Sequence, residues 1–175
     1  MLAKAANATT ADVSDFAMAL SQGGLVAKSA GLSFKETVLA LEALAKSGIK
    51  NSDAGTSLKT SLIQLIKPTA TQKELADKLN ISFIDQAGHF KDLADVSTML
   101  RARLGDMTKA QRTSVLATLA GTDGVRTLTA LYDAGAPRLN KWSKGLEEQG
   151  TAAEVAKIVA RVTLGADGKS SGAPV

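Results

Sequence analysis

The sequence predicts a mainly α-helical protein: about nine short helices packed as an irregular bundle, with one small β-hairpin at about 81–91. Three observations predict this fold class. Apolar residues recur three and four positions apart along most of the chain, which is the spacing of one helix face. Ser, Thr, Asp or Asn precedes most of these stretches as a helix cap. Gly or Pro follows them, as at the ends of helices.

The composition indicates what the core is made of. The chain has 175 residues, of which 45% are hydrophobic but only 3% are aromatic, so Ala, Leu, Val and Ile must fill the interior. Small side chains let helices approach closely, although each one buries a modest apolar area. We expect an approach segment at 1–10, one helical domain at 11–164 and a flexible tail at 165–175, where Gly and Ser are frequent.

The first helix of the domain is expected at about 11–21. Gly23 and Gly24 follow, and we expect them to interrupt the helix, because glycine is unfavourable in a helix interior. A short separate helix is then expected at 25–30.

Start and stop signals divide the rest of the chain in the same way. In a capping box, Ser or Thr caps the first turn of a helix and Glu or Gln three residues later bonds back to it. The predicted caps are Ser33 with Glu36, Asn51 or Ser52, Thr71 with Glu74, Asp92, Thr108 with Gln111, and Thr151 with Glu154. The predicted helix ends are Gly48, Pro68, Gly105, Gly135 and Gly150. Gly121 and Gly124 mark a joint between two helices, and Pro137 begins another helix.

Residues 81–91 depart from the helical period and predict the hairpin. Asp85 stands at the first position of a four-residue turn and Gly88 at the fourth, which favours a type I turn between two strands. A lone hairpin is marginal in water, so this one must lie on the helices. Phe83 and Phe90, two of the four phenylalanines, are its expected anchors.

No pattern of a catalytic, cofactor-binding or metal site is found, so we expect a protein that is not an enzyme and needs no cofactor. The chain has no cysteine and one histidine, His89, which is too few ligands for a typical zinc site. His89 is expected on the hairpin surface. The turn explains Asp85, and a core face shared with leucines explains Trp142. Glu147 and Glu148 are expected to form a solvated helix edge.

The charge pattern argues against a dedicated nucleic-acid binder. The formal net charge is +4, but Lys and Arg are spread along the chain without a run of four. Nucleic-acid binders usually concentrate basic residues on one stripe or arm, often beside stacking aromatic residues. We expect a slightly basic, solvated surface and no specific nucleic-acid binding, with weak binding through phosphates as an alternative.

An ordered series of short motifs runs along 30–136, each of them weak alone. They are Ala30-Gly31-Leu32-Ser33, Glu36-Thr37, Ala43 to Ser52, Asp53 to Thr60, Lys67-Pro68-Thr69, Ile81 to Val96, Leu119-Ala120-Gly121-Thr122 and Leu131 to Ala136. In this order they resemble the core region of phage tail tape-measure proteins.

The resemblance implies a structural virion protein. Such proteins run in several copies inside the tail tube, set its length during assembly and reach the tail tip. During infection they leave ahead of the DNA and help its passage through the envelope. The implied partners are tail-tube proteins, distal tail or tip proteins and further copies of the same chain, with contact to the host envelope during ejection. The implied location is the virion tail, assembled in the host cytoplasm. The resemblance carries over no catalytic, cofactor-binding or metal residues.

The chain is too short to be the ruler itself. As one unbroken helix it would span about 260 Å, but its glycine and proline stops exclude such a rod. Folded compactly, a chain of this length has a radius of gyration of about 16 Å. We therefore expect a folded module of a longer tape measure protein. The alternative is a stand-alone helical adaptor or tail-assembly chaperone.

Overall fold

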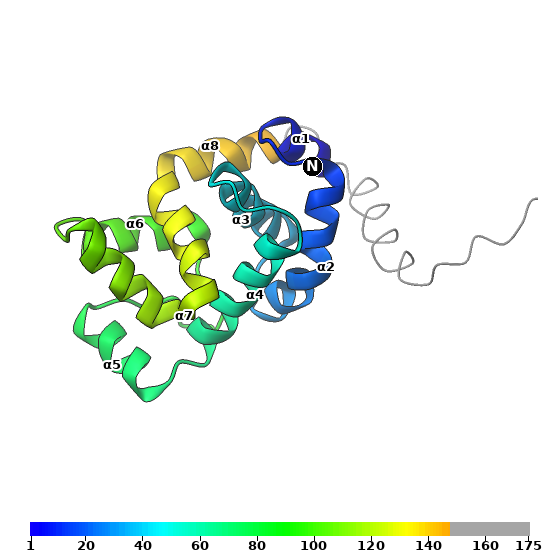
Figure 1. The fold of residues 1–175 in the computed structure, drawn as a ribbon. Coiled ribbons are helices and arrows are strands. Elements are labelled where there is room, and N and C mark those ends of the chain that lie inside the picture. Colours follow the sequence, from blue (N-terminus) through cyan, green and yellow to red (C-terminus); the bar gives the residue numbers. More distant parts are fainter. Residues whose placement is uncertain (148–175) are drawn as a thin grey trace, which may run out of the picture.

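Eight α-helices, and no β-strand, make up residues 1–147, which are the residues that this computed structural model describes (Figure 1). The mainly helical class is confirmed. The helices are α1 (Leu2–Asn7), α2 (Val13–Ser29), α3 (Phe34–Lys46), α4 (Asn51–Ile66), α5 (Ala70–Lys78), α6 (Leu93–Leu104), α7 (Lys109–Ala134) and α8 (Ala136–Glu147). The helix predicted from Thr151 with Glu154, its preceding stop at Gly150 and the tail at 165–175 lie outside the described residues. The division at 1–10, 11–164 and 165–175 stays a prediction.

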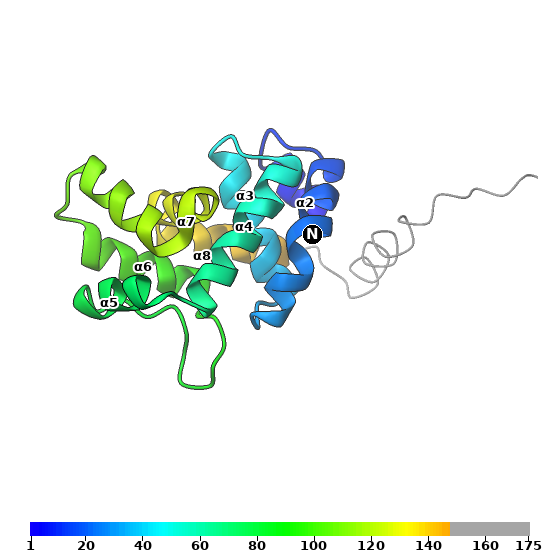
Figure 2. The same cartoon turned by 60° about the horizontal axis from the view of Figure 1, so that its bottom comes forward.

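Helix α3 lies at the centre of the bundle. All of its residues from Thr37 to Ala45 are buried, so this helix needs neighbours on every side. It packs against α1, α2, α4, α7 and α8. Helix α4 packs in turn between α2 and α7 (Figures 1 and 2). Leu and Ala supply most of the buried side chains, as the composition predicts.

The predicted break at Gly23 and Gly24 is wrong, because α2 runs unbroken from Val13 to Ser29. The reason is a close crossing with α4. A β-carbon on Gly23 would lie 2.7 Å from the carbonyl oxygen of Gly55, and one on Gly55 would lie 2.2 Å from the carbonyl oxygen of Ala19. Both distances are shorter than van der Waals contact, so glycine is required where the two backbones meet. This packing offsets the cost of placing glycine, which has a low helical propensity, inside a helix.

Helix α7 contains the joint that the sequence predicts. Gly121 has φ +78° and ψ 172°, which interrupts the helical backbone and divides α7 into two segments. Gly124, three residues later, faces α4, where a β-carbon would lie 2.8 Å from the α-carbon of Ser61. Gly135, with φ +75°, ends α7 as predicted. Glycine therefore serves both as a hinge and as a contact point in one helix.

Several predicted helix signals are confirmed in atomic detail. The Ser33 hydroxyl accepts the Glu36 N–H at the start of α3, although Glu36 does not bond back to complete the predicted capping box. Thr108 and Gln111 form the predicted reciprocal capping box of α7. Helix α4 ends at Ile66, directly before the Lys67-Pro68 pair. These signals act within one turn, which explains why they can be found from the sequence.

The predicted caps of α4 and α5 are wrong. Helix α4 begins without a side-chain cap, since neither Asn51 nor Ser52 bonds to its first turn and Asn51 itself has φ +57°. In α5 the capping box joins Thr69 to Gln72, two residues before the predicted pair. Here the Gln72 side chain also donates to Gln64 Oε1 on α4 at 2.9 Å, so a tertiary contact favours the earlier start.

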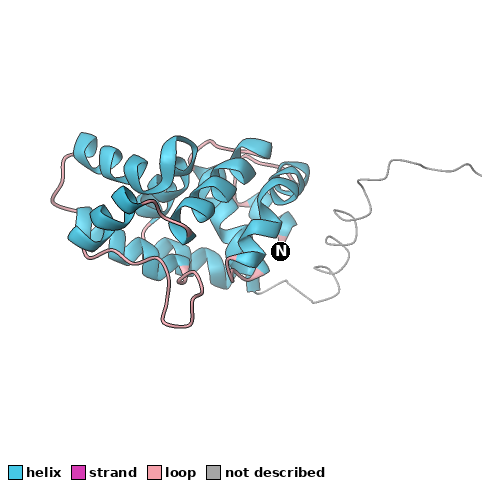
Figure 3. Cartoon of the chain, turned by 90° about the horizontal axis from the view of Figure 1, so that it is seen from below, coloured by secondary structure: helices cyan, strands magenta, loops and turns pink. Residues whose placement is uncertain are grey.

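The predicted β-hairpin is not formed. Among the described residues, 81–91 contribute one isolated antiparallel bridge, between Ile84 and Phe90. The Phe90 N–H donates to the Ala30 carbonyl, at 3.0 Å, in the joint between α2 and α3. In the register of this bridge the Phe90 N–H points away from Ile84, because the ladder bonds run from Asp85 to His89 and from Lys91 to Phe83. Pairing stops after these two bonds, since α6 begins at Leu93. The residues form instead a loop that projects from the helical body (Figures 2 and 3).

Phe83 and Phe90 anchor this loop, as the sequence predicts. Each side chain is about 6% exposed, and their rings stack with centroids 6.1 Å apart. The Lys91 N–H donates to the Phe83 carbonyl at 2.9 Å and joins the two ends of the loop. The apolar anchors thus hold a polar tip away from the bundle.

Candidate functional site

The tip of the projecting loop is organised by Asp85. Its Oδ1 accepts the N–H groups of Ala87 and His89, both at 2.9 Å, while the Asp85 N–H donates to the His89 carbonyl at 2.8 Å. These bonds, led by that from His89, hold the pKa of the Asp85 carboxyl below its usual value. The role predicted for Asp85 in a turn is confirmed. His89 is exposed, as expected, and its side chain lies against Gly31.

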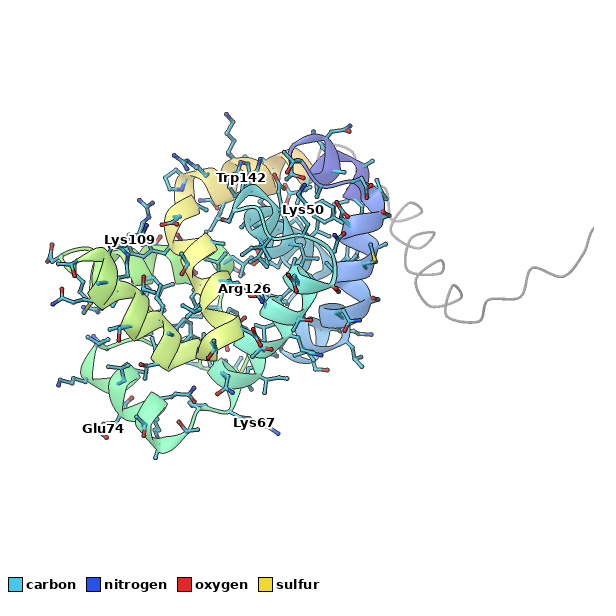
Figure 4. All side chains as sticks on the ribbon, viewed as in Figure 1. Lys50, Lys67, Glu74, Lys109, Arg126 and Trp142 are labelled. Carbon is cyan, nitrogen blue, oxygen red and sulfur yellow. The ribbon has the colours of Figure 1, made fainter. Side chains whose placement is uncertain are left out.

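Two other residues that the sequence singled out, Trp142 and Glu147, lie on α8. Glu147 pairs with Lys35 at the start of α3 and is exposed, while Glu148 lies outside the described residues. Trp142 is half-buried between the fully buried Leu139 and Leu146, so it packs on the core as expected (Figure 4). The structure does not bring these residues together with Asp85 and His89.

An open depression of about 510 Å³ lies where α6 meets α7. Its lining residues are Arg103, Asp106, Met107, Gln111, Ser114 and Val115. Ser114 has no histidine beside it, since the single histidine of the chain stands in the projecting loop. The residues that line the depression therefore include no Ser–His pair.

Within residues 1–147, no three His, Cys, Asp or Glu side chains gather in a group that could hold a metal ion. No helix in that part of the chain has the length and apolar character to cross a membrane.

A polar contact that the sequence does not reveal joins α3 to α6. Asp92 was predicted to cap α6, but its side chain makes no cap bond. The Leu93 N–H donates instead to Glu36 Oε2 at 3.0 Å. Burial raises the pKa of Glu36, although the bond from Leu93 opposes this effect. No local signal identifies this cap, because 57 positions separate the two residues.

Glu42 and Lys46 join α3 to α1 and α8. The Glu42 side chain is 2% exposed, and its Oε1 lies 3.6 Å from Lys46 Nζ. The same ammonium donates to the Ala8 carbonyl after α1 at 2.6 Å and lies 4.8 Å from the centre of the Trp142 ring. Burial raises the pKa of the Glu42 carboxyl, and Lys46 opposes this effect.

We expect the Tm of Glu42→Gln, measured relative to the wild type, to increase as the pH rises from about 4.5 to neutrality. The pKa of Glu42 is higher in the folded state than in the unfolded state. The contribution of Glu42 to stability is therefore present at pH values below the unfolded-state pKa, and it is lost as the pH rises through the folded-state pKa. Glutamine removes that loss. Thermal melts of both proteins across this pH range give the difference in Tm.

Glu147→Gln is the matched control and should show the opposite slope, at pH values below about 4.5. The hydrogen bond from Lys35 lowers the pKa of Glu147 in the folded state. The contribution of Glu147 to stability is therefore present at pH values above the unfolded-state pKa, and it is lost as the pH falls through the folded-state pKa. A Tm difference for Glu42→Gln that does not change with pH would contradict the prediction.

The charged groups described so far cap helices, hold a loop or join elements, which is typical of a structural or interaction module. A family model described as phage-related minor tail protein matches residues 1–121, more than half of the chain. The chain belongs to this family of phage tail proteins, which confirms the resemblance and the structural tail role that the sequence predicts.

Two curated relatives are tape measure proteins. The chain is 35% identical over 160 residues to the tape measure protein of Pneumococcus phage Dp-1, covering 91% of this chain and 14% of that protein. It is 28% identical over 177 residues to the probable tape measure protein of Escherichia phage P2, covering 97% of this chain and 21% of that protein. The chain therefore spans about a seventh and a fifth of their lengths. No solved structure matches it.

Proposed function

We propose that this chain is a folded module of a tape measure protein and works through contacts with other tail components. The observation that carries the proposal is a pair of facts: nearly the whole chain aligns with a small share of two tape measure proteins, and it folds into a bundle. The remaining length of such a protein would act as the ruler during assembly.

The dimensions of the bundle support this division of work. Its longest helix, α7, has 26 residues and would reach about 39 Å if straight, but the joint at Gly121 bends it. The same chain drawn out as one helix would reach about 260 Å. A folded module therefore adds little length to a tail and much contact surface.

In this proposal the module occupies the tail tube or tip and contacts tube proteins, distal tail or tip proteins and further copies of the chain. It is assembled in the host cytoplasm, meets the host envelope during ejection and assists genome delivery. It acts without catalysis, cofactor or specific nucleic-acid binding. The projecting loop around Asp85 is one exposed element for such contacts (Figure 3).

An in-frame deletion of residues 1–147 from the full tape measure gene tests the proposal. We expect fewer assembled tails, with the completed ones shortened by far less than about 220 Å, the length of 147 residues in one helix. The matched control removes 147 residues from a continuous predicted helix elsewhere in the same protein and should shorten tails by about that length. Electron micrographs of negatively stained tails give both numbers.

Tails shortened equally by the two deletions would show that the module is part of the ruler and would overturn the proposal. Electron density for residues 1–147 at the tube or tip of assembled tails would support it. A chain that acts on assembly intermediates but is absent from finished tails would favour the adaptor or chaperone.

A further inference from the structure

The seam between α2 and α4 has a solvent-exposed side. Gln22 is exposed, yet its β-carbon lies against the place where Gly55 meets α2, so Gln22 marks the outer edge of the seam. Met18 and Leu25 stand four residues before and three after it, on the same face of α2. They are 46% and 78% exposed.

A matching row runs along α4. Lys59, Ile63 and Ile66 follow Gly55 at intervals of four, four and three residues, so they continue the face of α4 that meets the seam. Ile63 is 47% and Ile66 is 37% exposed. We name the two rows together the seam surface: Met18, Gln22 and Leu25 of α2 with Lys59, Ile63 and Ile66 of α4.

The two rows lie side by side because α2 and α4 run in the same direction. Lys50 Nζ at the start of α4 donates to the Thr10 carbonyl, just before α2, at 2.7 Å. Further along both helices, Gly55 of α4 meets α2 at Ala19 and Gly23. The two rows therefore start from one crossing and extend in the same direction.

Positive charge borders the seam surface. Lys28 follows Leu25, Lys59 belongs to the α4 row, and Lys67 follows Ile66 and extends away from the fold (Figure 4). Within residues 1–147 none of these three lysines forms an ion pair with a carboxylate. The acidic residues of α2 and α4 themselves are engaged elsewhere: Asp15 in the capping box of α2 and Asp53 with Arg126.

We propose that the seam surface binds an amphipathic helix of another protein whose apolar stripe is bordered by Asp or Glu. Two parallel rows of exposed apolar side chains on neighbouring helices suit the i, i+3, i+4, i+7 stripe of a third helix. The bordering lysines select for acidic flanks through charge complementarity. This inference concerns the surface itself and holds independently of the proposed place in the tail.

Charge argues against two other occupants. A second copy of the chain, joined through the same surface, would place these lysines against each other. The chain's own residues 151–164 carry the apolar row Val155, Ile158, Val159 and Val162, but Lys157 and Arg161 stand among them. Both occupants bring like charges together, which lowers affinity.

Binding of two synthetic helical peptides to the 175-residue chain tests the proposal by fluorescence anisotropy. Both peptides carry a leucine stripe; one has glutamate at every flanking position and the other has lysine. We expect the acidic peptide to bind about ten-fold more tightly at low salt, with the difference shrinking as salt is added. Equal affinities, or no binding of the acidic peptide, would overturn the proposal.

Variants locate the binding surface. Leu25→Ser with Ile63→Ser should weaken the acidic peptide about ten-fold, and Lys59→Glu with Lys67→Glu should reverse the preference between the peptides. Val13→Ser is the matched control, because Val13 is 45% exposed on α2 but belongs to neither row. An effect of Val13→Ser as large as that of the Leu25 and Ile63 pair would overturn the assignment.

Two further measurements decide between occupants. Sedimentation should show the full chain as a monomer, or as an oligomer that the double substitution Leu25→Ser with Ile63→Ser does not dissociate. Ile158→Asp in the full chain should leave peptide affinity unchanged. A dimer that the double substitution dissociates would assign the surface to a second copy, and tighter peptide binding by Ile158→Asp would assign it to residues 151–164; either result would overturn the proposal.

Discussion

Gly55→Ala is expected to lower the free energy of unfolding by about 2–3 kcal/mol. The added β-carbon would lie 2.2 Å from the Ala19 carbonyl oxygen and 2.8 Å from the Gln22 β-carbon. The first is a backbone atom and the second is a β-carbon, so neither can move aside by a change of side-chain rotamer. Helix α2 would have to move away from α4, which opens packing along the whole crossing. Urea denaturation of the variant and the wild type measures the difference.

Gly24→Ala provides the matched control on the facing helix. A β-carbon at position 24 meets only the Leu20 side chain, at 3.8 Å or more, which is ordinary contact. Alanine is also favoured over glycine inside a helix, so this variant should gain about 0.5–1 kcal/mol. Loss of stability in both variants would show that the crossing is not what requires glycine. A neutral Gly55→Ala would show that the helices can separate without cost.

Phe90→Ala is expected to destabilise the protein by about 3 kcal/mol, as is usual when a buried phenylalanine is truncated. The ring is 6% exposed and stacks on Phe83. Its loss leaves a cavity under the projecting loop and weakens the hold of the loop on Ala30. Urea denaturation measures the global effect. Hydrogen exchange of the Ala87 and His89 amides, which bond to Asp85, should be faster in the variant.

His89→Ala is the control beside it in sequence. His89 is exposed, so its replacement should change stability by no more than about 0.5 kcal/mol. The Asp85 bonds use the backbone N–H of residue 89, which alanine keeps. Unchanged amide exchange in Phe90→Ala would contradict the anchoring role. A large effect of His89→Ala would move that role to the loop tip.

Gly23 and Gly121 differ in how well local sequence predicts their conformation. Gly121 was predicted to mark a joint and does so, with φ +78°. Gly23 was predicted to break a helix, yet α2 passes through it. The difference comes from Gly55, 32 positions away, whose backbone lies against Gly23. Nothing within one turn of either glycine carries that information.

The residues described for the candidate site divide in the same way. The places of Asp85, His89 and Trp142 follow from local patterns, and the structure agrees with them. The cap that Glu36 supplies to Leu93, and the seam surface formed by α2 and α4, could not be predicted. Each depends on two segments that only folding brings together.

By itself the sequence determined that the chain is helical, that Thr108 caps one helix and Pro68 stops another, and that Phe83 and Phe90 are buried. Caps, stops and apolar periodicity act within one or two turns, so they can be found in a single segment. Only the tertiary structure decided that Gly23 lies inside a helix and that residues 81–91 form a loop instead of strands. The first outcome depends on Gly55, whose position is set by the packing of distant helices. The second depends on the start of α6 at Leu93, which the distant Glu36 caps.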